Sequence, residues 1–159
     1  MPKYRHLTYE ELQELEKEFI NFLVLKSITA DEWVKMKNKT PEKAARFLEL
    51  FSDFVFESIS RNIQFLELRK PKDLISCQCL ESKIVIVGMK APLKSNADFT
   101  DKTFIQQAFL NPPPELKVYT TERSYVKSRE EDLFAMTQSG YTITDGKIFK
   151  TLSLALPGR

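Results

Sequence analysis

Glycine and histidine are scarce in this sequence, and their scarcity excludes several kinds of active site. The 4 glycines, at positions 88, 140, 146 and 158, are too scattered to form a phosphate-binding loop or a dinucleotide-binding motif. The only histidine, His6, precedes the first predicted helix, and no G-x-S-x-G sequence is present. A serine–histidine–aspartate triad would therefore depend on His6, and we identify no catalytic residue from motifs.

Cysteine is also rare, and both copies, Cys77 and Cys79, lie in the stretch LISCQCL. Residues two apart in a strand share a face, and a turn at 81–82 would place the cysteines opposite Ile84 and Ile86. A disulfide within the pair is disfavoured because the two side chains run parallel. A zinc site needs three or four ligands, which this stretch does not supply. We predict that the pair is buried, reduced and free of metal, and we expect no cofactor.

Long hydrophobic runs are absent. The longest apolar run, from Phe19 to Ile28, is interrupted by Asn21, Lys26 and Ser27, and it is shorter than the roughly 20 residues that cross a bilayer. The first residues lead into a charged helical pattern instead of the apolar core of a signal peptide. Two cysteines in a chain of this length also favour a reducing compartment. We therefore expect a soluble, cytoplasmic protein without membrane insertion.

Neither sign of charge dominates. The chain has 24 Lys and Arg against 22 Asp and Glu, a formal net charge of +2, which gives no signal for a polyanionic partner. Hydrophobic residues make up 42% of the 159 residues and include 12 Phe. This composition predicts a single domain over residues 1–159 with a sizeable aromatic core.

The first half of the chain shows helical periodicity with clear start signals. Thr8 and Thr29 are each followed three residues later by glutamate, which is the spacing of a capping box. Pro41 stands where a proline opens a helix without loss of a hydrogen bond. These signals predict three helices in a helical part over about residues 8–62.

The third predicted helix has an apolar arc wider than a surface helix needs. The arc contains Phe47, Leu48, Leu50, Phe51, Phe54, Val55, Phe56, Ile59 and Ile63. We expect this helix to be sandwiched between the first helix and a sheet. The alternative is that part of the arc is a surface for a partner. On the opposite face, Asp53 and Glu57 are one turn apart, and we interpret them as a solvated pair, since an acid–base pair normally needs a cleft.

After about residue 63 the apolar period changes to two. Strands are predicted at Ile63–Leu68, Leu74–Leu80, Lys83–Met89 and 116–121. A short helix capped by Thr100 is expected over Asp101–Leu110, and another begins after Ser128 and ends at Gly140. Asp145-Gly146 is either a hairpin turn or the start of a last helical turn.

Together these patterns predict an α+β fold. N-terminal helices should pack on a mainly antiparallel sheet built from residues 63–90 and 116–121. Two shorter helices should lie in the C-terminal half, which spans about residues 63–159.

Two aromatic residues are candidates for contact with a protein partner. Trp33, the only tryptophan, lies in the short second helix, and Phe56 lies at the edge of the apolar arc. Tryptophan is enriched at binding hot spots. The alternative is that Trp33 closes one end of the helical core, because aromatic residues dominate core burial as well.

A small basic patch is the second candidate surface. Arg123, Lys127 and Arg129 flank a tyrosine, and we group Lys90 and Lys94 with them as contacts for RNA. Acidic residues surround this segment at positions 122 and 130–132, so an ordinary charged loop leading into a capped helix explains it more simply.

Three stretches of the chain resemble a family of uncharacterised bacterial proteins, a domain of unknown function. They are SITADEW (27–33), FSDFVFE (51–57) and SGYTITDGKIFKTL (139–152). Members of that family sometimes carry an automatic histidyl-tRNA synthetase label. We reject the label because the chain is far too short and lacks the glycine-rich and arginine signatures of that enzyme class. The resemblance implies no activity, cofactor or catalytic residue.

The hypothesis that best fits these observations is a non-catalytic interaction module or complex subunit that binds another protein. The alternative is an RNA- or ribosome-associated factor, and an enzyme of unrecognised type comes third. Affinity for RNA would fall steeply with salt because phosphate contacts release counterions, whereas an apolar protein interface is much less sensitive.

Overall fold

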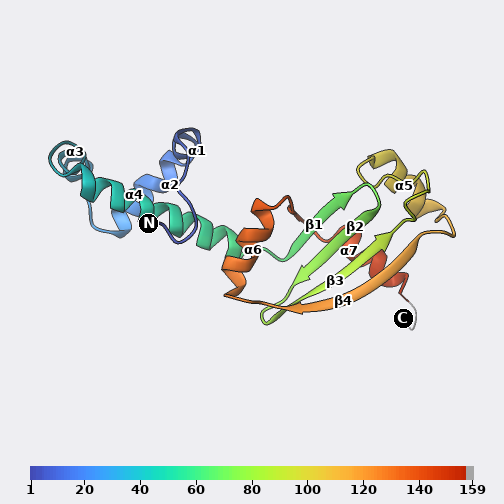
Figure 1. Ribbon diagram of the computed structural model, residues 1–159. Helices are drawn as coiled ribbons and strands as arrows, with labels where there is room; N and C mark the ends of the chain where they lie inside the picture. The colour runs from blue at the N-terminus through green and yellow to red at the C-terminus, as the bar shows by residue number, and fades with distance from the viewer. Residues whose placement is uncertain (157–159) are drawn as a thin grey trace. The chain divides into compact units, whose positions relative to one another are not determined.

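The computed structural model describes residues 1–156, and the chain divides into two compact units. The first unit is Met1–Ile59 and the second begins at Ser60. The predicted α+β class is confirmed, because four helices precede an antiparallel sheet in the chain (Figure 1). The division into units does not test the prediction of a single domain.

The helices of the first unit begin close to where the sequence predicts them. They are α1 (Tyr9–Glu14), α2 (Glu16–Leu25), α3 (Ala30–Lys39) and α4 (Pro41–Arg61), whose last residues belong to the second unit. Thr8 and Glu11 form the predicted capping box, and the hydroxyl of Thr29 accepts a hydrogen bond from the Glu32 N–H at 3.1 Å. The first predicted helix is divided at Leu15, where φ −100° and ψ 19° are not helical. Its apolar spacing continues across the break, so periodicity alone does not reveal it.

Phenylalanine rings form the core of the first unit. On α2, the ring of Phe19 lies 5.0 Å from that of Phe51, and the ring of Phe22 lies 5.1 Å from that of Phe47. Phe51 has no exposed surface. These tilted and edge-on pairs join α2 to α4, which confirms the predicted aromatic core for this unit.

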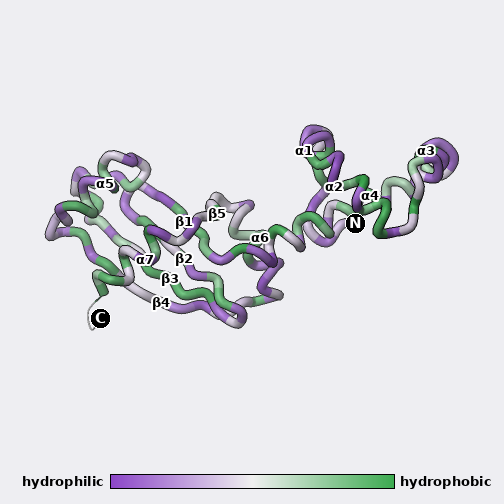
Figure 2. The backbone as a smooth tube through the Cα atoms, turned by 180° about the vertical axis from the view of Figure 1, so that it is seen from behind, coloured by the Kyte–Doolittle hydropathy of each residue, from purple (hydrophilic) through white to green (hydrophobic). Residues whose placement is uncertain are grey.

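The second unit is built on a five-stranded antiparallel sheet of order β4-β3-β2-β1-β5. Its strands are β1 (Phe65–Lys70), β2 (Asp73–Cys79), β3 (Lys83–Lys90), β4 (Lys117–Ser124) and β5 (Thr142–Thr144). Cys77 pairs with Ile86 and Cys79 with Ile84, which is the predicted register. The edge strand β4 carries mainly hydrophilic residues (Figure 2).

Helices cover both faces of this sheet. On the cysteine face, Leu133 and Met136 of α6 (Arg129–Gln138) join a cluster with Leu66 and Ile84. The opposite face is covered by α5 (Lys102–Leu110) and α7 (Lys147–Leu154). There, Leu74, Val87 and Met89 of the sheet cluster with Phe99, Ile105, Phe149 and Leu152.

Three details of the C-terminal half differ from the prediction. The α5 helix is capped by Asp101, whose carboxylate accepts from the Thr103 N–H at 2.9 Å, and Thr100 bonds to Asp98 instead. A fifth strand, β5, pairs with β1, and its partner is too distant in sequence for local patterns to show it. Of the two alternatives for Asp145-Gly146, the helix is the correct one, and α7 is a third short helix where two were predicted, with Gly146 at φ 84° as its N-cap.

Candidate functional site

The two cysteines lie in the core of the second unit. Cys77 has no exposed surface and Cys79 has almost none, so the predicted burial is confirmed. Burial raises the pKa of the Cys77 thiol to about 12 and that of Cys79 to about 11, with Arg123 opposing both shifts. Because the thiolate is the reactive form of cysteine, these protonated side chains act as small apolar groups in the sheet.

Trp33, the first candidate partner contact, is half-buried in the first unit. Its ring packs edge-on against Phe19 at 5.1 Å and tilted against Phe47 at 5.6 Å. The Lys37 ammonium lies 5.9 Å from the centroid of the indole ring. These contacts match the alternative in which Trp33 closes one end of the helical core.

Phe56, the second candidate, lies under the N-terminal segment and is only 9% exposed. The Arg5 guanidinium carbon lies 4.5 Å from its ring centroid. The Asp53 carboxylate accepts hydrogen bonds from the N–H groups of Lys3 and Tyr4 at 2.8 and 3.0 Å. The Glu57 carboxylate accepts a hydrogen bond from the Tyr4 hydroxyl. The Asp53 and Glu57 pair, which we expected to be solvated, therefore holds this segment against α4.

Large apolar side chains are exposed mainly in the first unit, although it is the smaller of the two. Those exposed in the described part of this unit are Met1, Tyr9, Ile20, Val24, Leu25, Val34, Leu50, Phe54 and Ile59. Contiguous exposed apolar surface marks interaction sites on soluble proteins, and two of these residues, Leu50 and Phe54, are neighbours on one face of α4. It favours the alternative in which part of the apolar arc of α4 is a partner surface.

Among these exposed residues, Leu50 and Phe54 form what we call the α4 strip. They are 57% and 47% exposed, and side chains four residues apart lie together on one helix face. The Phe54 ring is 5.2 Å from that of Phe22, whose ring lies 5.6 Å from the Lys26 ammonium. The strip is therefore anchored to the aromatic core. The width of the apolar arc was the signal for it in the sequence.

Arg129, a member of the predicted basic patch, forms hydrogen bonds to main-chain groups of the second unit. Its guanidinium donates to the carbonyls of Ser60, Arg61, Ile63, Cys79 and Leu80. The bonds to Ser60, Cys79 and Leu80 are each 3.1 Å long. With these bonds made, Arg129 ties the first turn of α6 to the end of α4 and to β2.

The structure separates the other members of the basic patch. Arg123 pairs with Ile84 near the start of β3, whereas Lys90 is the last residue of that strand. Six residues of strand span about 20 Å. Lys127 is exposed just before α6, and Lys94 is exposed in the loop after β3. The five residues therefore do not form one surface.

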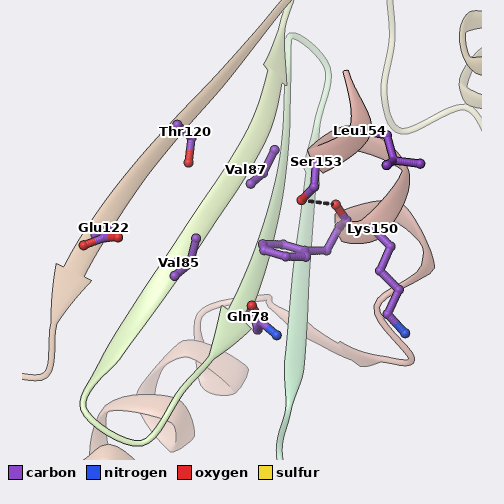
Figure 3. A pocket seen from close by; sticks show the side chains of 9 residues that line it. Gln78, Val85, Val87, Thr120, Glu122, Lys150, Ser153 and Leu154 are labelled. Carbon is purple, nitrogen blue, oxygen red and sulfur yellow. Dashed lines mark hydrogen bonds between the residues drawn. The ribbon is translucent and has the colours of Figure 1, made fainter. Parts of the chain in front are cut away.

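A groove of about 530 Å³ lies beside α7 on the sheet face away from the cysteines. Gln78, Val85 and Val87 form its floor, Thr120 and Glu122 of β4 lie along one side, and α7 lies along the other (Figure 3). The Glu122 carboxylate pairs with Lys83 at 3.1 Å. The groove combines a small apolar floor with mixed polar walls, so it indicates no particular chemistry.

Among the described residues, no group of three or more His, Cys, Asp or Glu side chains is placed to hold a metal ion. Within the same part of the chain, no helix is long and apolar enough to span a membrane.

Comparison with protein families identifies the class. A model of a family of unknown function, DUF6495, matches residues 1–156. The chain belongs to this family, as its resemblance to a domain of unknown function implied. Neither the curated proteins nor the solved structures gave a match to the chain.

Proposed function

We propose that this protein is a non-catalytic cytoplasmic interaction module and that the α4 strip binds an amphipathic helix of another protein. The observation that carries the proposal is the exposure of Leu50 and Phe54 at 57% and 47% on a helix that is otherwise anchored in an aromatic core. Binding in this mode uses apolar anchors spaced three and four residues apart on the incoming helix.

Charge around the strip defines the partner further. Arg46 and Lys43 are exposed one and two turns, respectively, before Leu50 on the same side of α4, and the Lys26 ammonium lies near Phe22. A partner helix with carboxylates beside its apolar anchors complements these cations, which improves the rate and specificity of association.

Site-specific photo-crosslinking in the native cell tests this proposal. A photoreactive residue at position 50 should link to a polypeptide whose attached segment is an amphipathic helix flanked by Asp and Glu. The same residue at position 110 is the control, since Leu110 is 88% exposed in the second unit. Equal labelling from both positions, or linkage to segments without this pattern, would contradict the proposal.

A synthetic peptide of the linked segment then gives a quantitative check. Leu50→Asp should weaken its binding by at least about tenfold, whereas Leu110→Asp should leave it unchanged. Urea melts of both variants verify that the fold persists. Unaltered affinity in folded Leu50→Asp would overturn the assignment of the strip.

The RNA alternative has less support from the fold. Arg129 is occupied by main-chain carbonyls, and the remaining basic candidates lie at opposite ends of β3. Phosphate binding at either end would have to rely on two of the five residues.

A further inference from the structure

A pocket of about 390 Å³ in the second unit has walls from three separate parts of the chain. Arg69 of β1, Lys102 of α5 and Lys147 of α7 contribute cationic side chains, and Ile105, Phe109 and Ile148 contribute apolar surface. No carboxylate lines this pocket. The volume falls within the range of small-molecule sites, about 300–1,000 Å³.

The cations of the pocket keep free donors. The Arg69 Nε donates to the Glu67 carboxylate at 2.7 Å, and its two terminal nitrogens make no hydrogen bond with any described residue. Glu67 is nearly buried, so it orients the guanidinium while the outer edge stays available. The Lys102 ammonium has no ion-pair or hydrogen-bond partner among the residues that the structure describes.

Lys147 is the third cation, and its carboxylate partner is distant. Its ammonium lies 3.9 Å from the Asp145 carboxylate, and both side chains are largely exposed to solvent. An ion pair of this kind contributes little. Lys102 and Lys147 are also the first residues of α5 and α7, where the helix dipole adds a partial positive charge.

We propose that this pocket binds a small organic anion, with a phosphate or carboxylate group carried on an apolar or aromatic body. Arginine offers a planar pair of donors that matches the oxygens of either group, and the lysines add point charges. The apolar surface of Ile105, Phe109 and Ile148 takes the body of the ligand. The site lies in the second unit and is independent of the α4 strip.

The test uses the full-length protein and three probes in NMR titrations of backbone amides. Phenyl phosphate has both the anion and the aromatic body, inorganic phosphate has only the anion, and benzyl alcohol has only the body. Phenyl phosphate should produce saturable shifts at residues 105–109 and 147–151. The other two probes should bind at least about tenfold more weakly. Benzoate in place of phenyl phosphate distinguishes a carboxylate site from a phosphate site.

Variants test whether the cations of the pocket bind the anionic group of phenyl phosphate. Lys102→Gln should weaken phenyl phosphate by about tenfold or more, and because this side chain has no partner among the described residues, the fold should persist. Lys94→Gln, an exposed lysine outside the pocket, is the matched control and should have no effect. Non-saturable shifts, shifts elsewhere on the protein, or equal affinity of Lys102→Gln and wild type would overturn the proposal.

Discussion

A single side chain, Arg129, organises the junction where α6 meets the sheet. Its guanidinium has five N–H donors in a fixed plane, and five main-chain carbonyls receive hydrogen bonds from it. Two of these carbonyls, of Ser60 and Arg61, belong to the last residues of α4, and a third, of Ile63, lies just beyond it. Carbonyls at the end of a helix lack partners within the helix. Arg129 therefore has a structural role, although the basic residues and the tyrosine near it in the sequence suggested a nucleic-acid contact.

Substitution of Arg129 should be costly. Arg129→Ala leaves several carbonyls without a donor, and we expect the second unit to lose about 3 kcal/mol of unfolding free energy. Arg129→Lys should recover only part of this loss, because a compact ammonium cannot reach the same set of carbonyls. Urea melts measure both changes. Lys127→Ala, which alters an exposed side chain two residues before Arg129, is the control. A near-neutral Arg129→Ala would mean that water replaces the guanidinium.

At the scale of elements, two helices end in the same motif with different residues. After α2, the Ile28 N–H bonds to the Leu23 carbonyl at 2.9 Å and Ser27 has φ 58°. After α6, the Tyr141 N–H bonds to the Met136 carbonyl at 3.1 Å and Gly140 has φ 111°. Both are Schellman motifs, in which the left-handed residue is normally glycine.

Ser27 occupies a left-handed position that normally holds glycine, so substitutions at Ser27 and at Gly140 should change stability in opposite directions. Ser27→Gly removes the steric cost of a left-handed residue with a Cβ, so the first unit should gain about 1 kcal/mol. Gly140→Ser imposes that cost on the end of α6, and the second unit should lose a similar amount. Urea melts of the two variants provide the comparison. Equal signs for both would show that the conformation of this residue does not limit either helix end.

At the scale of the whole molecule, each unit has its own core and its own natural reporter. Trp33 is the only tryptophan and lies in the first unit, and both cysteines are buried in the second. Because burial raises the pKa of both thiols, they remain protonated and protected at pH 8 until the second unit opens. Tryptophan fluorescence and thiol labelling therefore follow different units.

A matched pair of core variants tests whether the units unfold together. Phe51 and Leu133 are both fully buried, one in each unit. Phe51→Ala should lower the unfolding free energy of the first unit, measured by tryptophan fluorescence, by roughly 3–5 kcal/mol. Leu133→Ala should lower the unfolding free energy of the second unit, measured by thiol labelling, by roughly 2–5 kcal/mol. We expect each variant to move only the transition of its own unit. Coincident shifts of both probes would support the single cooperative domain that the composition predicts.

Local signals predicted much of the fold because they depend on near neighbours. The capping residues before α1, α3 and α6 place their oxygen atoms against N–H groups three residues away, so spacing alone identifies them. The C-x-C stretch and its turn likewise determined which residues face the cysteines. The candidate sites were harder to predict, since exposure and pairing depend on what packs nearby. Phe56 is covered by the N-terminal segment, while Leu50 in the same arc is not.

The sequence by itself determined the starts of α1, α3, α4 and α6, the β2–β3 register, the apolar role of the cysteines and the α+β class, because each depends on periodicity or on neighbours a few residues apart. Only the tertiary structure decided the pairing of β5 with β1, the use of Arg129 and the gathering of Arg69, Lys102 and Lys147 around one pocket. Those features join residues that are tens of positions apart. Their proximity follows from how the sheet and its helices pack, which no local pattern encodes.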